Sequence, residues 1–170
     1  MKKFFFRILF YFLCMMVFPG KLYAQRFFYR FYNMNDGLPG TQIFNVHEDA
    51  NGYLWVCEKE GISRFDGRQF VNYSITEGLP SLTTNNVFQD SKMRLWVSTP
   101  GGMAQFINGR FVTFPTNDKQ TDLFVFSITE TKEKKILALT DKGVYEFAGS
   151  EWKKISLYPG FENKMCRSIV

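Results

Sequence analysis

The chain has 170 residues, of which 45% are hydrophobic, 18% aromatic and 22% charged, a composition that supports a folded core and excludes a disordered chain. Its net charge of +5 arises at the N-terminus, because residues 1–24 hold four basic side chains and no acidic one, and the remainder holds 17 basic and 16 acidic residues. The rest of the chain therefore lacks the clustered positive charge that nucleic-acid binding needs.

Residues 1–24 have the layout of a secretory signal peptide. Lys2, Lys3 and Arg7 form a positive segment, Ile8 to Phe18 is apolar, and the segment ends at the small residue Ala24. The apolar run is shorter than the roughly 20 residues that span a bilayer. We therefore expect cleavage after Ala24 and a periplasmic mature chain.

A period of 41 residues runs through the mature chain. Large apolar residues and glycines recur at this spacing, and the recurring sets are Trp55, Trp96 and Leu137, then Gly61, Gly102 and Gly143, then Phe65, Phe106 and Phe147, then Phe70, Phe111 and Trp152. The tripeptide Gly37-Leu38-Pro39 also recurs, as Gly78-Leu79-Pro80. So many positions in one register identify a repeat protein.

Each repeat predicts four short strands, which in the first copy cover Ile43 to Glu48, Tyr53 to Cys57, Ile62 to Phe65 and Gln69 to Tyr73. The residues Asn51-Gly52 between the first two strands favour a type I′ turn. Four antiparallel strands in a period of about 40–45 residues are typical of a β-propeller blade. The predicted fold is all-β, an incomplete ring of about three blades.

The predicted domains follow from this period. Residues 25–42 are expected to form an outer, ring-closing strand and a linker, followed by blades at 43–83, 84–123 and 124–165 and by the start of a fourth, truncated blade at 166–170. Propellers close with about four to eight blades. We therefore expect the chain to be the N-terminal part of a longer protein, with an apolar sheet face left uncovered in the third blade, where Leu137 and Phe147 would lack a neighbour.

The most specific motif of the first blade is Glu-Asp-Ala-Asn-Gly-Tyr-Leu-Trp-Val at residues 48–56, which continues with Gly-Ile-Ser-Arg-Phe-Asp-Gly at 61–67. The second blade repeats it at residues 89–99, with Gly102 and Phe106. Together with the Gly-Leu-Pro before each blade, these motifs resemble the two-component regulator propeller repeat. The third copy departs from this pattern, because Thr131 replaces the Asp, Leu137 replaces the Trp and no Gly-Leu-Pro precedes it.

The resemblance implies a non-catalytic periplasmic sensor region of a hybrid two-component system of the Bacteroidetes type. Such a region senses an oligosaccharide or another small extracellular ligand, and its partners are further propeller blades, a kinase region of a longer chain and a second copy of the sensor. No cofactor is implied. Two alternatives stay open, a propeller-scaffold enzyme of the polysaccharide lyase or glycosidase type and a protein-interaction scaffold.

Most of the repeated residues have a structural interpretation. The aspartates are expected to bond turn amides and the tryptophans to pack between adjacent sheets, and the full set is Asp49, Gly52, Trp55, Gly61, Phe65, Asp90, Trp96, Gly102, Phe106, Gly143 and Phe147. No catalytic or metal-binding set is expected, because His47 is the only histidine and the mature chain has two cysteines, Cys57 and Cys166, without metal-site spacing. These cysteines are expected to stay unpaired.

The ligand-binding candidates lie in the loops between second and third strands. These loops differ most in charge between the copies, and they offer Lys59 and Glu60 in the first blade and Asp141 and Lys142 in the third. Function on a propeller resides in variable loops at one face. The ligand-contacting residues are otherwise unknown at this point.

Overall fold

The computed structural model describes residues 29–156. The predicted signal peptide, residues 157–165 of the third blade, the truncated fourth blade and Cys166 lie outside these residues. The chain divides into two compact units after Phe31, and within the described part of the first unit the rings of Tyr29 and Phe31 meet edge to face at 5.1 Å. No helix within residues 29–156 has the length and apolar character needed to cross a membrane.

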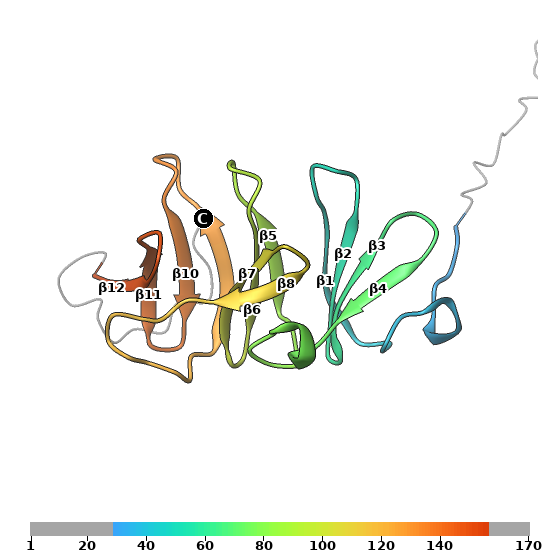
Figure 1. Cartoon of the computed structure of the whole chain (residues 1–170), viewed down its shortest axis with the longest axis horizontal. Coiled ribbons are helices and arrows are strands. Elements are labelled where there is room, and N and C mark those ends of the chain that lie inside the picture. The colour runs from blue at the N-terminus through green and yellow to red at the C-terminus, as the bar shows by residue number, and fades with distance from the viewer. Residues whose placement is uncertain (1–28, 157–170) are drawn as a thin grey trace, which may run out of the picture. The chain divides into compact units, whose positions relative to one another are not determined.

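Within residues 32–156 of the second unit, twelve strands form three four-stranded antiparallel sheets (Figure 1). Blade 1 contains β1 (Ile43–Glu48), β2 (Leu54–Glu58), β3 (Gly61–Phe65) and β4 (Phe70–Tyr73). Blade 2 contains β5 (Asn86–Gln89), β6 (Leu95–Thr99), β7 (Gly102–Ile107) and β8 (Arg110–Thr113). Blade 3 contains β9 (Val125–Glu130), β10 (Ile136–Thr140), β11 (Gly143–Phe147) and β12 (Trp152–Ile155). The predicted fold class is confirmed, and the three sheets form an arc that does not close.

The blades stand side by side along their first strands. Strand β1 contacts β5, and β5 contacts β9, so that the first strand of each blade faces the next along one edge of the arc. Within each blade the strands follow in sequence order, as a meander does. Successive side chains of a strand point to opposite faces, so each sheet has a forward face toward the next blade in sequence and a rear face toward the preceding one.

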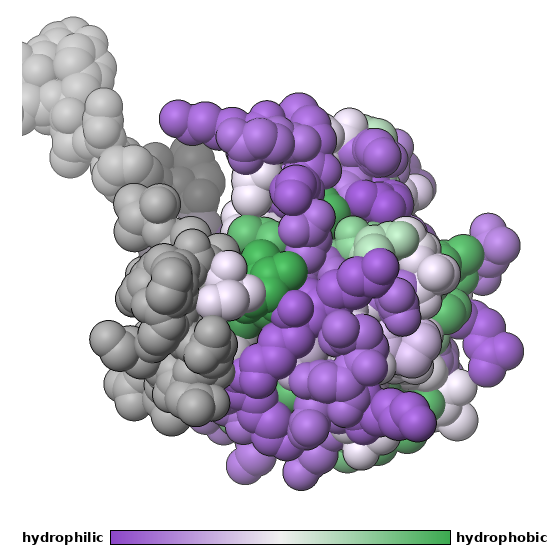
Figure 2. Space-filling view, turned by 90° about the vertical axis from the view of Figure 1, so that its left-hand side faces the viewer, coloured by the Kyte–Doolittle hydropathy of each residue, from purple (hydrophilic) through white to green (hydrophobic). Residues whose placement is uncertain are grey.

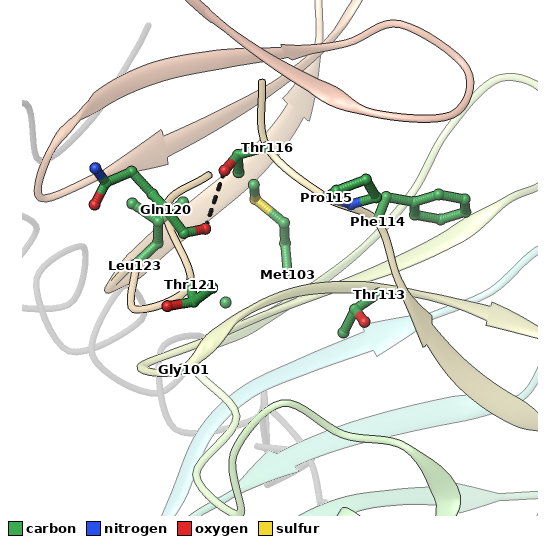
Figure 3. Close-up of a pocket in the computed structure, with 10 residues that line it drawn as sticks. Gly101, Met103, Thr113, Phe114, Pro115, Thr116, Gln120, Thr121 and Leu123 are labelled. Atoms are coloured by element: carbon green, nitrogen blue, oxygen red, sulfur yellow. Dashed lines mark hydrogen bonds between the residues drawn. The ribbon is translucent and has the colours of Figure 1, made fainter. Parts of the chain in front are cut away.

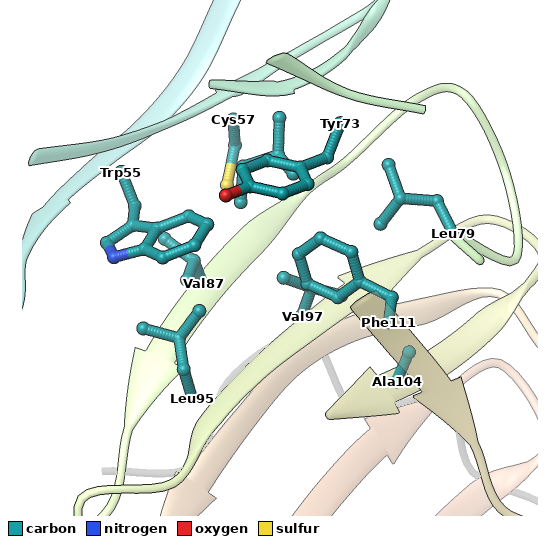
Figure 4. Close-up of a cluster of buried hydrophobic side chains, with 10 residues drawn as sticks. Trp55, Cys57, Tyr73, Leu79, Val87, Leu95, Val97, Ala104 and Phe111 are labelled. Atoms are coloured by element: carbon teal, nitrogen blue, oxygen red, sulfur yellow. The ribbon is translucent and has the colours of Figure 1, made fainter. Parts of the chain in front are cut away.

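The core consists of forward faces packed on rear faces. Between blades 1 and 2, the forward-face side chains of Trp55, Cys57, Ile62 and Tyr73 meet the rear-face side chains of Val87, Leu95, Val97, Ala104 and Phe111, and Leu79 closes the cluster (Figure 4). Between blades 2 and 3 the same repeat positions recur, with Trp96 and Met103 against Ile136 and Trp152. The period of 41 residues thus encodes one interface, used twice among the described residues.

The turn between β1 and β2 differs from the predicted type I′ turn. Gly52 has a φ of +83°, but Asn51 is not among the residues with positive φ, and a type I′ turn needs positive φ at both central residues. Met93 and Lys134 occupy the Gly52 position in the other blades, with φ of 64° and 65°. A type I′ pair occurs instead at Asn108 and Gly109, in the hairpin between β7 and β8, with φ of 49° and 82°.

The described part of the predicted outer strand, residues 29–32, forms no strand. A strand exists only beside another strand that accepts its backbone hydrogen bonds, and the twelve described strands already complete three sheets. Residues 33–42 instead carry the 3-10 helix η1 (Met34–Asp36), which is capped by Asn33. It recurs as η2 (Ile75–Glu77), which is capped by Ser74, so the connecting segments repeat with the blades.

The expectation that Phe147 lacks a neighbour is wrong. Phe147 lies on the rear face of blade 3, where its ring packs against Trp96 at 4.8 Å and Trp152 at 5.1 Å. Leu137 pairs across the strands with Glu146 and therefore points to the opposite face. There it is 7% exposed and clusters with Leu139 and other forward-face residues. Viewed from the β12 side, the described surface that is visible is largely hydrophilic, with hydrophobic side chains in several separate patches (Figure 2).

Candidate functional site

A hollow with a volume of about 390 Å³ lies where the chain crosses from blade 2 to blade 3 (Figure 3). One wall is the start of β7, with Met103, and the end of β8, with Thr113. The other wall is the crossing segment 114–123, whose two limbs lie on either side of Met103. The volume falls within the range of about 300–1,000 Å³ that is usual for small-molecule pockets.

The hollow exists because this crossing differs from the one before it. Between blades 1 and 2, the Gly-Leu-Pro segment packs closely on the sheets, with Leu79 only 3% exposed and the Pro80 carbonyl against Gly101. The crossing from blade 2 to blade 3 has no Gly-Leu-Pro and loops outward. Leu123 is its buried anchor, at 2% exposed.

Hydrogen bonds, rather than close packing, fix the position of the outward loop. Thr116 donates to the carbonyl of Gln120 at 3.0 Å, and the Tyr145 hydroxyl donates to Asp118 Oδ2 at 2.8 Å. The backbone of Trp152 in β12 bonds the segment twice, to Pro115 O and from Asn117 N–H, each at 2.8 Å. The segment is therefore an ordered wall.

The lining of the hollow is uncharged. Three threonines and Gln120 contribute polar groups, while Met103, Phe114, Pro115 and Leu123 contribute apolar surface, and Gly101 and Gly102 complete the wall. Hydroxyl and amide groups beside apolar surface suit a neutral ligand that carries both hydroxyl groups and C–H faces. The lining holds no acid–base pair.

The predicted candidates Lys59 and Glu60 lie away from this hollow, in the β2–β3 turn of blade 1. The backbone of Lys59 bonds neighbouring segments, with its N–H donating to Gln42 O at 3.3 Å and its carbonyl accepting from Thr83 Oγ1 at 3.3 Å. The carboxylate of Glu60 lies against Gly40. Both residues pack the turn against segments that flank blade 1.

Asp141 and Lys142 lie in the β10–β11 turn of blade 3 and hold the crossing segment that walls the hollow. Asp141 Oδ1 accepts from Phe124 N–H at 3.0 Å, and Lys142 Nζ donates to Gln120 Oε1 at 2.9 Å and Asp122 O at 2.8 Å. The structure thus keeps the two charged pairs on different blades. Sequence reasoning missed Met103, Thr113 and the lining residues of the crossing segment. The signal that could have found them was the missing Gly-Leu-Pro of the third copy.

Asp49 organises the first turn of blade 1. Its Oδ1 accepts from the backbone N–H groups of Asn51 at 2.9 Å and Tyr53 at 3.1 Å. Its Oδ2 accepts from Trp55 Nε1 at 2.8 Å. One carboxylate therefore satisfies two turn amides and the indole N–H that the tryptophan carries into the blade interface.

Asp90 repeats this arrangement in blade 2 and adds a cation. It accepts from Lys92 N–H at 2.9 Å, Arg94 N–H at 2.9 Å and Trp96 Nε1 at 3.0 Å, and Arg94 Nε donates to it at 2.6 Å. Burial raises the pKa of Asp90, but the hydrogen bonds from Trp96 and Arg94 outweigh it and hold the pKa below its usual range. Both repeated aspartates therefore stabilise the turn in which they lie and bind the indole N–H of the following tryptophan.

Two buried ionisable groups belong to β2. Burial raises the pKa of the Cys57 thiol to about 12, with a smaller opposing contribution from a hydrogen bond to Thr84. Cys57 is a free cysteine that is fully buried in the interface with blade 2. Glu58 is 0% exposed and points to the rear face, where burial raises its pKa in spite of hydrogen bonds with the Ser63 side chain and the Gly40 backbone.

A smaller hollow of about 140 Å³ lies at the opposite edge of blades 1 and 2, beside Asp49 and Arg64. The Arg64 guanidinium packs on the Tyr53 ring at 4.7 Å. Over residues 29–156, no group of three or more His, Cys, Asp or Glu side chains is arranged to hold a metal ion.

The family comparison agrees with the repeat motif. The family model described as "Two component regulator propeller" matches residues 37–57, which contain the first Gly-Leu-Pro, Asp49 and Trp55. A comparison with curated proteins gives no match.

Solved structures share the fold. The extracellular domain of a hybrid two component system from B. thetaiotaomicron is 18% identical with a TM-score of 0.63, over 83% of this chain and 19% of that one. A second such domain from the same organism is 22% identical with a TM-score of 0.57, over 76% and 20%. Virginiamycin B lyase from Staphylococcus aureus is 16% identical with a TM-score of 0.53, over 74% and 45%.

The chain thus spans about a fifth of the length of the two extracellular domains, and at these identities the likeness concerns the fold. The motif match and the blade geometry arise from the same residues, since the Gly-Leu-Pro, the turn aspartate and the interface tryptophan all lie within or beside blade 1. Residues 37–57 thus match the two-component regulator propeller repeat, and they belong to an arc of β-propeller blades.

Proposed function

We propose that the chain is a ligand-sensing propeller module of a two-component signalling system, acts in the periplasm after removal of a signal peptide, and is itself non-catalytic. Its ligand is an oligosaccharide or another small extracellular molecule. The family match and the likeness to extracellular domains of two component systems support this function.

The observation that carries the proposal is the hollow at the crossing from blade 2 to blade 3. It has the volume of a small-molecule pocket, and its wall is ordered by hydrogen bonds from β11 and β12. A lining of hydroxyls and apolar side chains matches a sugar, which presents hydroxyl groups at its rim and C–H groups on its faces.

Further blades and a kinase region of a longer chain are the proposed partners, together with a second copy of the sensor. The rear face of blade 1 supports the need for another blade. Val46 there is 54% exposed, whereas Val87 and Ile128, at the same repeat position in blades 2 and 3, are 3% and 4% exposed. A preceding blade would bury this face as blade 1 buries that of blade 2.

The test is ligand binding by the full chain and two adjacent variants. Thr121 lines the hollow from the crossing segment, so Thr121→Trp should fill it, whereas the next residue, Asp122, does not line it. Neutral oligosaccharides of defined composition would be titrated by calorimetry and by thermal shift. We expect wild type and Asp122→Trp to bind one class of oligosaccharide and Thr121→Trp to lose at least tenfold in affinity.

Equal affinity in all three proteins would contradict the hollow as the binding site. Binding of no oligosaccharide by the wild type would contradict the ligand class. Release of shortened products from a polysaccharide during the titration would contradict a non-catalytic module.

A further inference from the structure

Glu58 is a fully buried carboxyl group on the rear face of blade 1, beneath the segment that enters the blade. Its Oε2 accepts the backbone N–H of Gly40 at 3.1 Å, and its Oε1 lies 2.8 Å from Ser63 Oγ in the neighbouring strand β3. Ser63 Oγ lies 2.8 Å from Asn72 Oδ1 in β4, and Asn72 Nδ2 donates to Gly37 O at 2.8 Å. A chain of polar contacts therefore runs from Gly40 through the sheet and back to Gly37.

The number of hydrogens in this chain can be counted. The Ser63 hydroxyl has one hydrogen, but it makes two oxygen–oxygen contacts at hydrogen-bond distance, to Glu58 and to Asn72. The orientation of the Asn72 amide follows from its bond to Gly37, because the reverse orientation would set two carbonyl oxygens against each other. Asn72 Oδ1 therefore accepts the Ser63 hydrogen, and the Glu58–Ser63 contact needs a hydrogen on Glu58.

We propose that the folded protein holds Glu58 as a neutral carboxylic acid, and that loss of this proton unlatches the entering segment Gly37–Gly40 from blade 1. In the protonated form, Oε1 donates to Ser63, Ser63 donates to Asn72, and the carbonyl oxygen Oε2 accepts from Gly40. Ionisation removes one hydrogen, so the Ser63–Asn72 contact becomes repulsive and draws Asn72 away from Gly37. A charge left without water in the sheet adds a desolvation cost.

The surroundings of Glu58 favour the neutral form. The entering segment Gly37–Gly40 contains no ionisable side chain, and the flanking contact from the next crossing is Thr84, whose hydroxyl accepts from Glu58 N–H at 3.1 Å. Glu60, which lies against Gly40, adds a repulsive negative charge, and Lys59 is the cation of the same turn. Burial comes first among the causes that raise the pKa of Glu58.

The latch belongs to blade 1 alone among the three. The positions equivalent to Glu58 are Thr99 and Thr140, whose hydroxyls bond within their own turns, to Gly102 O at 2.9 Å and to Gly143 O at 2.8 Å. Neither residue titrates. Among the three blades, only blade 1 therefore binds its entering segment through a side chain that can lose a proton.

The direction of the pH effect follows from linkage. In the unfolded chain Glu58 ionises near the ordinary value of about 4.3, and in the folded protein it ionises at higher pH, so the folded state holds the extra proton between these values. Stability is therefore highest at low pH with respect to this group, and it falls as pH rises through that window. Each unit of pKa difference raises the unfolding constant about tenfold across the window.

The test compares urea unfolding of the full chain from about pH 4 to pH 8 with that of two variants. Glu58→Gln keeps the donor and acceptor of the neutral acid without a titratable proton, and Glu60→Gln is the matched control in the same turn. We expect the unfolding constant to rise with pH in wild type and in Glu60→Gln, and this rise to be absent in Glu58→Gln. Parallel profiles for wild type and Glu58→Gln would overturn the proposal.

A second measurement needs no substitution at Glu58. In wild type at mildly acidic pH, infrared difference spectroscopy should detect a buried protonated carboxyl band, and the Asn72 side-chain amide resonances should shift as this band disappears with rising pH. Amide resonances that stay constant while the band disappears, or no such band at any pH at which the chain is folded, would overturn the latch. Because the hollow at blades 2 and 3 does not include Glu58, either result leaves the ligand-binding test unaffected.

Discussion

Blades 1 and 2 close the turn between their first two strands with an aspartate, whereas blade 3 uses a threonine at the same place. In the first two blades, the next strand carries a tryptophan whose indole N–H bonds the second carboxylate oxygen. In blade 3 that strand carries Leu137, whose side chain has no N–H, and the Thr131 hydroxyl accepts from the backbone N–H groups of Glu133 at 3.2 Å and Lys135 at 3.4 Å.

The comparison shows that the aspartate and the tryptophan act as a unit. A buried indole N–H without an acceptor costs free energy, so tryptophan at this position requires a group with two acceptor oxygens aimed in different directions. Once leucine replaces tryptophan, one acceptor suffices. The two departures of the third copy from the motif are thus one linked change, which leaves the turn geometry intact.

Among the changes that test this comparison, removal of the blade 2 carboxylate should lower the free energy of unfolding most. Asp90→Ala leaves Trp96 Nε1 and two turn amides without their acceptor and leaves Arg94 without its partner. We expect a loss of about 3 kcal/mol in the free energy of unfolding, measured by urea denaturation. Lys92→Ala, an exposed change in the same turn, is the control and should stay near wild type; equal losses in both would refute the role of the carboxylate.

A double-mutant cycle sharpens the claim that the two residues form a unit. Asp90→Thr and Trp96→Leu each move blade 2 toward the blade 3 pair, and each alone leaves a mismatch. We expect the double variant to be more stable than the sum of the single losses by about 1–2 kcal/mol. Strict additivity of the two losses in denaturation experiments would show that the two residues are independent.

The blade 3 turn should depend less on its side chain. Thr131→Ala removes one hydroxyl that accepts from two exposed amides, which water can replace in part. We expect a loss of about 1 kcal/mol, smaller than that of Asp90→Ala. A loss as large as that of the aspartate would mean that the threonine does more than accept these amides.

The smallest expected effect is that of acid pH, which should weaken the turn of blade 2 but not that of blade 3. The pKa of Asp90 is lower in the folded protein than in the unfolded chain, so its stabilising contribution is present above the unfolded value and is lost as pH falls through the folded one. Thr131 has no such dependence. We expect Asp90→Asn to flatten the decline of the urea midpoint at acid pH, and an unchanged decline would contradict the assignment.

Much of the fold was predictable because it repeats. The strands of blade 1 begin and end within one residue of their expected positions, since strands and turns are encoded by near neighbours such as Asn51 and Gly52. The candidate site was less predictable. Its walls come from Met103 and from Leu123, which are distant in sequence, and the outward course of the crossing depends on bonds from Tyr145 and Trp152 in the following blade.

The sequence by itself determined the number of described blades, their meander topology and the interface positions, because a fixed period of 41 residues repeats the same alternation of apolar and polar side chains. Only the tertiary structure decided which face each side chain occupies at the blade ends, as Phe147 shows, and which polar groups meet. Glu58, Ser63 and Asn72 lie on three different strands, and no local pattern marks them. Their contacts arise from strand register and from the entering segment folding over them, and such long-range geometry is set by packing of the whole blade.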